Sequence, residues 1–422
     1  MTNPLINWWR SSQFRSALKQ GNLRAARDIL QQIETSGAKL SWLEELFKKQ
    51  LKTEESLAFY RQEVASFSKR LNLVSDNKLT PDAAFIDFIH KSLKLIEHDE
   101  GKLQCTGIEE RVFDDFEANL AYFIDTELEK ISPGKLKDEL NKAIEDLEGL
   151  KQGIDPNYNF KLSAYVYLLK YFPENVYCAY LAWFLIYEAG LLPDKIKILD
   201  IGAGPGTIVY GLALLLNSSS GFFPPPKMHI SYYSFEQQDL LQFRGLQFWR
   251  KYIEPQQTAT NVYFRFDTND IFDYSNNSKK LPEAFFDFIV VSHCFFYQPQ
   301  QLRKSHKIYS QMFANHLAPG GYVLLIVQGR KLFSSYDVVE SEDISQEEKV
   351  ISMFLAELKL KLEWYKFVTS TGKRKAMGKD FVIFARENLS PQKYISPLQQ
   401  QYLGQKYISN YAIDDYIILA RR

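Results

Sequence analysis

Lys195-Ile-Lys-Ile-Leu-Asp-Ile-Gly-Ala-Gly-Pro-Gly-Thr207 is the stretch that decides the fold. Its first half is a short β-branched apolar run, which is typical of a buried parallel strand. Three glycines follow at once, and residues 208–216 are apolar enough to predict a helix. A strand that turns through glycines into a helix brings the backbone close to a ligand and aims helix N-terminal amides at its polar groups. The alternative, a tight turn without a ligand, is less favoured because glycine destabilises a chain wherever its freedom is unused.

Composition limits the class of protein. At 422 residues the chain exceeds one average domain, so we expect two. Lys plus Arg equals Asp plus Glu, 51 each, so no global field steers the protein toward nucleic acid or an anionic membrane. The three cysteines, Cys105, Cys178 and Cys294, form no C-x-x-C pair, which disfavours zinc and iron–sulfur sites, and we predict no metal. Because no stretch reaches the ~20 apolar residues of a membrane span, we expect a cytoplasmic protein.

Ahead of the glycine stretch, the chain reads as helical. Apolar residues at three- and four-residue spacing predict a helical N-terminal domain over residues 1–155. Its later helices are expected at 40–52, 55–71, 81–97, 109–129 and 135–151. Two aromatic-rich helices are then expected up to residue 192. We expect most of their aromatic side chains in the core, with Tyr165 and Tyr177 as candidate pocket walls.

Beyond the glycine stretch, apolar strands alternate with helices, as a doubly wound α/β sheet requires. The predicted strands are 229–235, 261–266, 286–292 and 322–327, followed by an antiparallel pair at 363–370 and 380–386. A Tyr-rich extension over residues 389–422 ends in Asp415-Tyr-Ile-Ile-Leu-Ala-Arg-Arg422, which repeats the pattern of Asp380-Phe-Val-Ile-Phe-Ala-Arg386. We expect this extension to pack on the preceding domain as an added strand or a cover.

Leu199-Asp-Ile-Gly-Ala-Gly-Pro-Gly-Thr207 resembles motif I of the class I S-adenosylmethionine (SAM) methyltransferases. The resemblance covers about residues 158–387. It implies a Rossmann-like, seven-stranded α/β domain at 156–388, preceded by the all-α N-terminal domain, with SAM as the cofactor. Residues 165–206 are also similar to the ribosomal small-subunit methyltransferase-like family, whose clustered cysteines this chain lacks.

The resemblance also implies a set of cofactor-binding residues. In it the glycines line the methionine part of SAM, and an acid ending the second strand accepts hydrogen bonds from both ribose hydroxyls. A carboxylate suits that role because its two acceptor oxygens face a vicinal diol. An acid after the third strand, Asp267 here, reaches the adenine amino group, whereas the neighbouring Asp270 is expected to be a turn or cap residue. Glu236 is the acid that ends the second strand. The full set of candidate cofactor-binding residues is Asp200, Gly202, Ala203, Gly204, Gly206, Glu236, Asp267, Thr268 and Ser292.

The segment Ser292–Tyr297 follows the fourth strand and is expected beside the transferable methyl group. Its sequence lacks the Asn/Asp-Pro-Pro-Tyr/Phe signature of exocyclic-amine methyltransferases and the Pro-Cys nucleophile of pyrimidine C5 enzymes. His293 is a candidate general base, with a hydrogen-bonded pocket residue as the alternative. Tyr297 is the polar handle of an otherwise aromatic wall.

Three functions remain open from the sequence. The aromatic surroundings favour a methyltransferase that acts on a small, partly apolar acceptor. The same chemistry on RNA or protein, with the helical domain as a docking surface, is the second hypothesis. The third is an assembly factor that binds SAM and transfers nothing.

Overall fold

A computed structural model of the chain describes residues 10–14, 16–17, 23–36, 78–150, 156–222, 228–256, 261–277, 281–296, 298–374 and 381–422. The chain divides into two compact units, residues 1–76 and residues 77–422. In the first unit, α2 (Leu23–Thr35) and the helical residues Phe14 and Ala17 form a small apolar core. The helices predicted at 40–52 and 55–71 lie outside the described residues.

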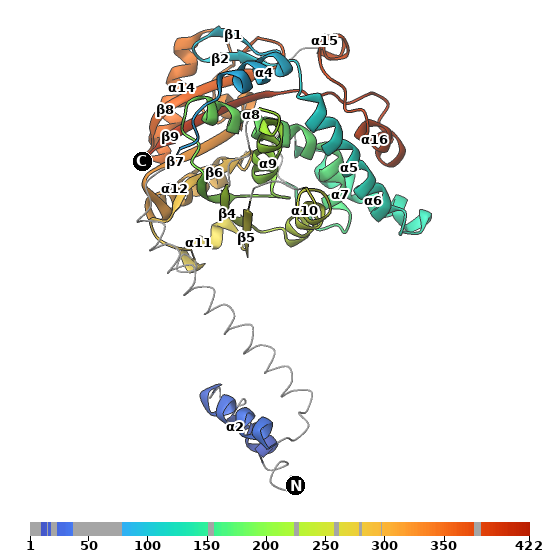
Figure 1. Cartoon of the computed structure of the whole chain (residues 1–422), viewed down its shortest axis with the longest axis vertical. Helices are drawn as coiled ribbons and strands as arrows, with labels where there is room; N and C mark the ends of the chain where they lie inside the picture. The colour runs from blue at the N-terminus through green and yellow to red at the C-terminus, as the bar shows by residue number, and fades with distance from the viewer. Residues whose placement is uncertain are drawn as a thin grey trace. The chain divides into compact units, whose positions relative to one another are not determined.

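One mixed sheet organises the second unit (Figure 1). Among the described residues it has nine strands, in the order β1-β2-β8-β9-β7-β6-β3-β4-β5. Strands β3 to β7 pair in parallel, and β9 lies antiparallel between β7 and β8. The β1–β2 hairpin extends the edge, with β2 parallel to β8. The strands are β1 (Ile96–Asp99), β2 (Lys102–Gln104), β3 (Lys195–Ile201), β4 (His229–Glu236), β5 (Asn261–Thr268), β6 (Phe286–Ser292), β7 (Leu317–Gln328), β8 (Lys361–Thr369) and β9 (Asp414–Arg421).

The sheet corrects two predictions. It has nine strands instead of seven, because the β1–β2 hairpin joins its edge. The antiparallel strand beside β8 is β9, from the C-terminal extension, and not residues 380–386. Residues 381–388 form a helix, α15 (Phe381–Asn388), on which Val382 and Ile383 are exposed. In β9, by contrast, residues 415–420 are all buried, so the end of the extension forms an inner strand of the sheet. Its helix α16 packs against α5, α6 and α7.

Helices surround the sheet, and α8 and α9 lie side by side against it (Figure 1). Within the described residues, no helix has the length and apolar character needed to cross a membrane. The helices of the second unit, besides α15, are α4 (Ala83–Leu93), α5 (Glu110–Leu128), α6 (Pro133–Leu147), α7 (Ser163–Lys170), α8 (Phe172–Glu188), α9 (Thr207–Ser219), α10 (Asp239–Tyr252), the 3-10 helix η2 (Ile271–Asp273), α11 (Tyr274–Asn277), α12 (Pro299–His316), α13 (Gly329–Ser334), α14 (Ile344–Leu358) and α16 (Ile395–Leu403).

Residues 78–150 share their core with the sheet. The ring of Phe113 on α5 meets that of Tyr177 on α8 at 5.6 Å between centroids, and Phe116 meets Tyr210 on α9 at 6.2 Å. All four side chains are buried in one apolar cluster with strands β3, β4 and β6. An all-α N-terminal domain over 1–155 is therefore not confirmed: the chain divides after residue 76, and residues 78–150 contribute two strands and three helices to the second unit.

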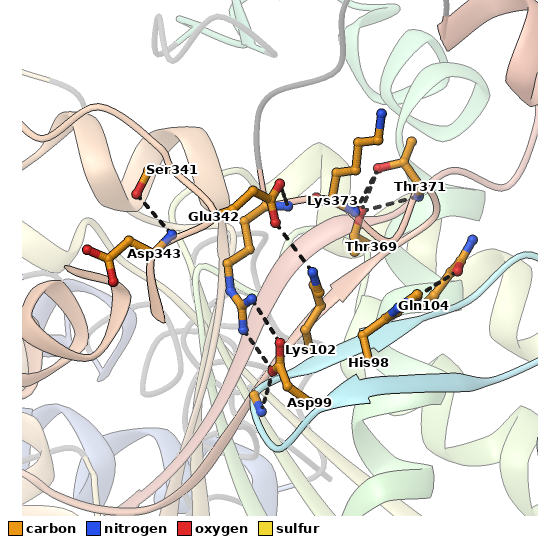
Figure 2. A network of polar contacts seen from close by, with 12 residues as sticks. His98, Asp99, Lys102, Gln104, Ser341, Glu342, Asp343, Thr369, Thr371 and Lys373 are labelled. Atoms are coloured by element: carbon orange, nitrogen blue, oxygen red, sulfur yellow. Dashed lines mark hydrogen bonds and ion pairs between the residues drawn. The ribbon is translucent and has the colours of Figure 1, made fainter. Parts of the chain in front are cut away.

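A buried ion pair holds the β1–β2 hairpin in place. Arg374, which follows β8, donates from Nη1 and Nη2 to Asp99 at 2.9 and 2.8 Å and from Nε to Glu347 at 2.7 Å. Its backbone N–H donates to Glu342, which also pairs with Lys102 at 3.3 Å. Figure 2 shows Lys102 on the hairpin pointing toward Glu342 from the segment before α14, with Asp99 below them. The network thus connects the hairpin, α14 and the loop after β8.

Candidate cofactor and acceptor site

The glycine turn lies between β3 and α9, as the sequence predicts. Gly202 has a φ of 68° and Gly204 a φ of 54°, in the left-handed region that favours glycine. A Cβ added to Gly202 would lie 2.4 Å from Sγ of Cys294, so Gly202 is also required by a close approach. Its N–H donates to the carbonyl of Phe235 at 2.8 Å, which fixes the turn against the end of β4.

Glu236, the last residue of β4, lies directly against this turn. Its Oε2 accepts from the Gly204 N–H at 2.9 Å, and its Oε1 accepts from the Gln238 N–H at 2.8 Å. The residue is 8% exposed, and this burial raises the pKa of its carboxyl, while the two backbone amides oppose the rise. The buried Glu236 carboxylate thus contacts the glycine turn, and main-chain N–H donors fix its orientation.

A cavity of about 380 Å³ opens beside these groups, at the carboxyl ends of the parallel strands. Of the predicted site residues, Gly202, Gly204, Glu236, Ser292 and His293 line it. Among the other residues that line it are aromatic and polar ones: Tyr158, Tyr167, Tyr171, Phe272, Phe296, Asn157, Asn175, Gln237, Asn269, Asp270, Gln328 and Lys331.

Asp200 does not line the cavity. It is buried at the end of β3, and its Oδ2 accepts from the Tyr232 hydroxyl at 2.5 Å. Burial raises the pKa of Asp200 to about 7, against the lowering effect of that hydrogen bond. Its Oδ1 has no hydrogen-bond partner within the part of the chain that the structure describes. Ala203 and Gly206 belong to the turn but do not line the cavity, and Gly206 is the N-cap of α9.

Asp267 and Thr268 are the last two residues of β5. Asp267 accepts a hydrogen bond from the Asn269 side chain, and the Thr268 hydroxyl donates to Gln242 at 2.9 Å. Neither Asp267 nor Thr268 lines the cavity, whereas Asn269 and Asp270 do. Asp270 is the N-cap of η2, as its predicted role as a turn or cap residue required, because its Oδ1 accepts from the Phe272 N–H at 2.9 Å.

The two tyrosines named as candidate pocket walls, Tyr165 on α7 and Tyr177 on α8, do not face the cavity. Both side chains are buried in the core. The Tyr177 hydroxyl donates instead to the carbonyl of Gly107 at 2.6 Å. Tyr167, two residues after Tyr165, faces the cavity and accepts at its hydroxyl from the Asn175 amide at 3.1 Å.

His293 lies immediately after β6, and both of its ring nitrogens have partners. Nδ1 is 3.0 Å from the Ser292 hydroxyl, and Nε2 is 3.1 Å from Oδ1 of Asp415 on β9. Asp415 is 122 positions away in the chain, so no local motif could have indicated it. The Cys178 thiol, from α8, lies within 4.8 Å of the imidazole and the carboxylate. Tyr297, the other predicted catalytic residue, lies outside the described residues.

No family model matches the sequence, and no curated protein matches it. Solved structures that match the chain include SAM-dependent methyltransferases, the class that the glycine motif resembles. One from Methanosarcina mazei is 16% identical, with 55% of this chain and 94% of that one covered and a TM-score of 0.31. A loganic acid methyltransferase determined with SAH is 12% identical (54% and 85% covered, TM-score 0.27). A 16S rRNA (adenine(1408)-N(1))-methyltransferase from Catenulisporales acidiphilia is 10% identical (53% and 84%, TM-score 0.28). At such values none of them assigns an acceptor or a residue role to this chain.

Proposed function

We propose that the chain transfers a methyl group from SAM to a small, partly apolar acceptor. The observation that carries the proposal is the Glu236 carboxylate, held against the glycine turn by the Gly204 N–H at the wall of the cavity. Open α/β sheets bind their ligands at the carboxyl ends of their strands, which is where this cavity lies. Its volume of about 380 Å³ is within the range of small-molecule pockets.

The residues present fit SAM. A carboxylate offers about four lone-pair sites, and backbone amides occupy two of those on Glu236, so the ribose hydroxyls would donate to the others. Gly204 leaves space on its side of the cavity, because the atom nearest to an added Cβ would be the Tyr167 hydroxyl oxygen at 3.9 Å. For the adenine, Asn269 and Asp270 replace Asp267 in our proposal, because they line the cavity and Asp267 does not.

When bound, SAM supplies a sulfonium methyl group that is already a strong electrophile. The chain therefore has to position the acceptor in line and exclude water. Phe272 and Phe296, whose ring centroids lie 5.0 Å apart, form an apolar wall next to Ser292 and His293. We propose that this wall holds the acceptor and that His293 takes up its proton.

Methyl transfer to fractionated acceptors tests the proposal. The full chain is incubated with SAM labelled at the methyl group and with small-molecule, RNA and protein fractions of a cell extract. Label in the small-molecule fraction is the expected result. Salt-sensitive labelling of RNA, or labelling of protein, would favour the macromolecular hypothesis instead. SAM binding without label in any fraction would favour a non-catalytic assembly factor. The cytoplasmic location stays a prediction, and fractionation of the source cells would check it.

A further inference from the structure

The backbone of His293 is held in an unusual conformation. Its φ is 56°, in the left-handed region, which costs a residue other than glycine roughly 1–2 kcal/mol. The His293 N–H donates to the carbonyl of Ile326 on β7 at 2.8 Å, which fixes this conformation. Such strain persists only where the surrounding structure determines it, and it gathers at functional sites.

The partners of the ring define its tautomer. A carboxylate oxygen accepts hydrogen bonds, so Nε2 is the nitrogen that carries the proton toward Asp415. In the neutral ring, Nδ1 then has the lone pair and accepts from the Ser292 hydroxyl. Ser292 and His293 line the cavity and Asp415 does not, so the basic nitrogen lies on the cavity side of the ring.

We propose that Asp415 is a positioning residue for methyl transfer, which holds His293 as the Nε2–H tautomer with Nδ1 turned toward the acceptor. The inference rests on the proposed function. The acceptor O–H or N–H would replace the Ser292 hydroxyl as the donor to Nδ1. Its proton passes to Nδ1 while its electron pair forms the bond to the methyl carbon. The methyl–sulfur bond breaks with its pair on sulfur, and the proton leaves Nδ1 for solvent after the product departs. The C-terminal strand β9 thereby becomes part of the active site.

The tautomer is measured without reference to activity. In long-range ¹H–¹⁵N NMR spectra of the full chain with labelled histidine, six imidazoles are expected. The one lost in His293→Gln is that of His293. In alkaline buffer we expect this ring to be the Nε2–H tautomer, and Asp415→Asn to convert a large part of it to the Nδ1–H form. Asp138→Asn, the same change at an exposed position on α6, is the control and should leave the spectrum as it is. An Nδ1–H tautomer in the wild type, or no change in Asp415→Asn, would overturn the inference.

Kinetics then test the consequence. Asp415→Asn should lower kcat by ~10²-fold or more, because general-base catalysis contributes about that much. The affinity for SAM, measured by calorimetry on the same variant, should stay within about twofold, because Asp415 does not line the cavity. A wild-type chain that binds no SAM would refute the proposed function, and the NMR result would still decide whether the pair exists. Loss of transfer on chelation and its recovery with Zn²⁺ would instead show Cys178, His293 and Asp415 to be metal ligands and overturn the inference.

Discussion

Arg374→Ala is the substitution whose effect follows most directly from the geometry. The side chains of Arg374 and Glu347 are 3% and 0% exposed, and their ion pair is 2.7 Å long. Without the guanidinium, the Glu347 carboxylate stays buried, and the donors left to it among the described residues are the Tyr365 and Tyr416 hydroxyls, at 3.0 and 2.6 Å. Removing one partner of a buried pair typically costs ~3–5 kcal/mol. The contact with Asp99, whose side chain is 31% exposed, adds less because solvent screens it.

Urea denaturation followed by circular dichroism measures this loss. We expect Arg374→Ala to lower the free energy of unfolding by ~3–5 kcal/mol, and the double variant Arg374→Met/Glu347→Gln to lose less, because no uncompensated charge is then buried. Arg330→Ala, at an exposed position, should change the free energy of unfolding by no more than ~0.5 kcal/mol. The folded fraction of each variant should bind SAM as the wild type does, because neither Arg374 nor Glu347 lines the cavity. An effect of Arg374→Ala as small as that of Arg330→Ala would refute the reasoning.

Three further predictions follow from the site. Phe296→Ala should lower methyl transfer while SAM affinity, measured by calorimetry, stays nearly intact, and loss of SAM binding in a folded variant would contradict it. Gly202→Ala should destabilise the chain by more than the ~1–2 kcal/mol of left-handed strain, since the new Cβ would meet Cys294; Gly320→Ala, with a φ of 77° and open space, should show the strain alone in the same thermal melts. Because burial raises the pKa of Asp200 to about 7, the native state binds the proton more tightly than the unfolded state. The free energy of unfolding should therefore fall as the pH rises from about 4 to about 7. In urea titrations, Asp200→Asn should reduce the fall in the free energy of unfolding between these pH values by up to roughly 4 kcal/mol. The same pH dependence in the variant and the wild type would contradict this prediction.

The central strands of the sheet could be predicted from the sequence, but the strands β1, β2 and β9 toward one edge could not. The glycine turn and Glu236 each follow an apolar strand directly, so local pattern was enough to predict their positions. The choice between residues 380–386 and 414–421 for the antiparallel strand could not be made in this way. Both segments have the same apolar pattern, and the pairing with β7 and β8 decides between them. The β1–β2 hairpin was missed because its strands have four and three residues, too few to show a period.

Some residues of the candidate site could be predicted from the sequence, and others could not. Strand ends placed Ser292 and His293 at the cavity, because parallel strands end at one edge of the sheet. The choice of Tyr167 over Tyr165 depends on the rotation of α7, which the apolar run from Ala164 to Leu169 does not reveal in its sequence. Asp415 reaches His293 only through the pairing of β9 with β7, a contact between distant parts of the chain.

Calorimetric titration of SAM into the full chain and into Glu236→Ala shows whether the cavity beside Glu236 binds SAM. We expect saturable binding to the wild type. For Glu236→Ala we expect affinity weaker by roughly ten- to a hundredfold, since hydrogen bonds to a charged acceptor contribute ~1.5–3 kcal/mol. Asp270→Ala, a second acid of the same cavity wall, serves as the matched variant and should weaken binding less. No heat and no thermal shift with SAM or S-adenosylhomocysteine at millimolar concentration would contradict this expectation.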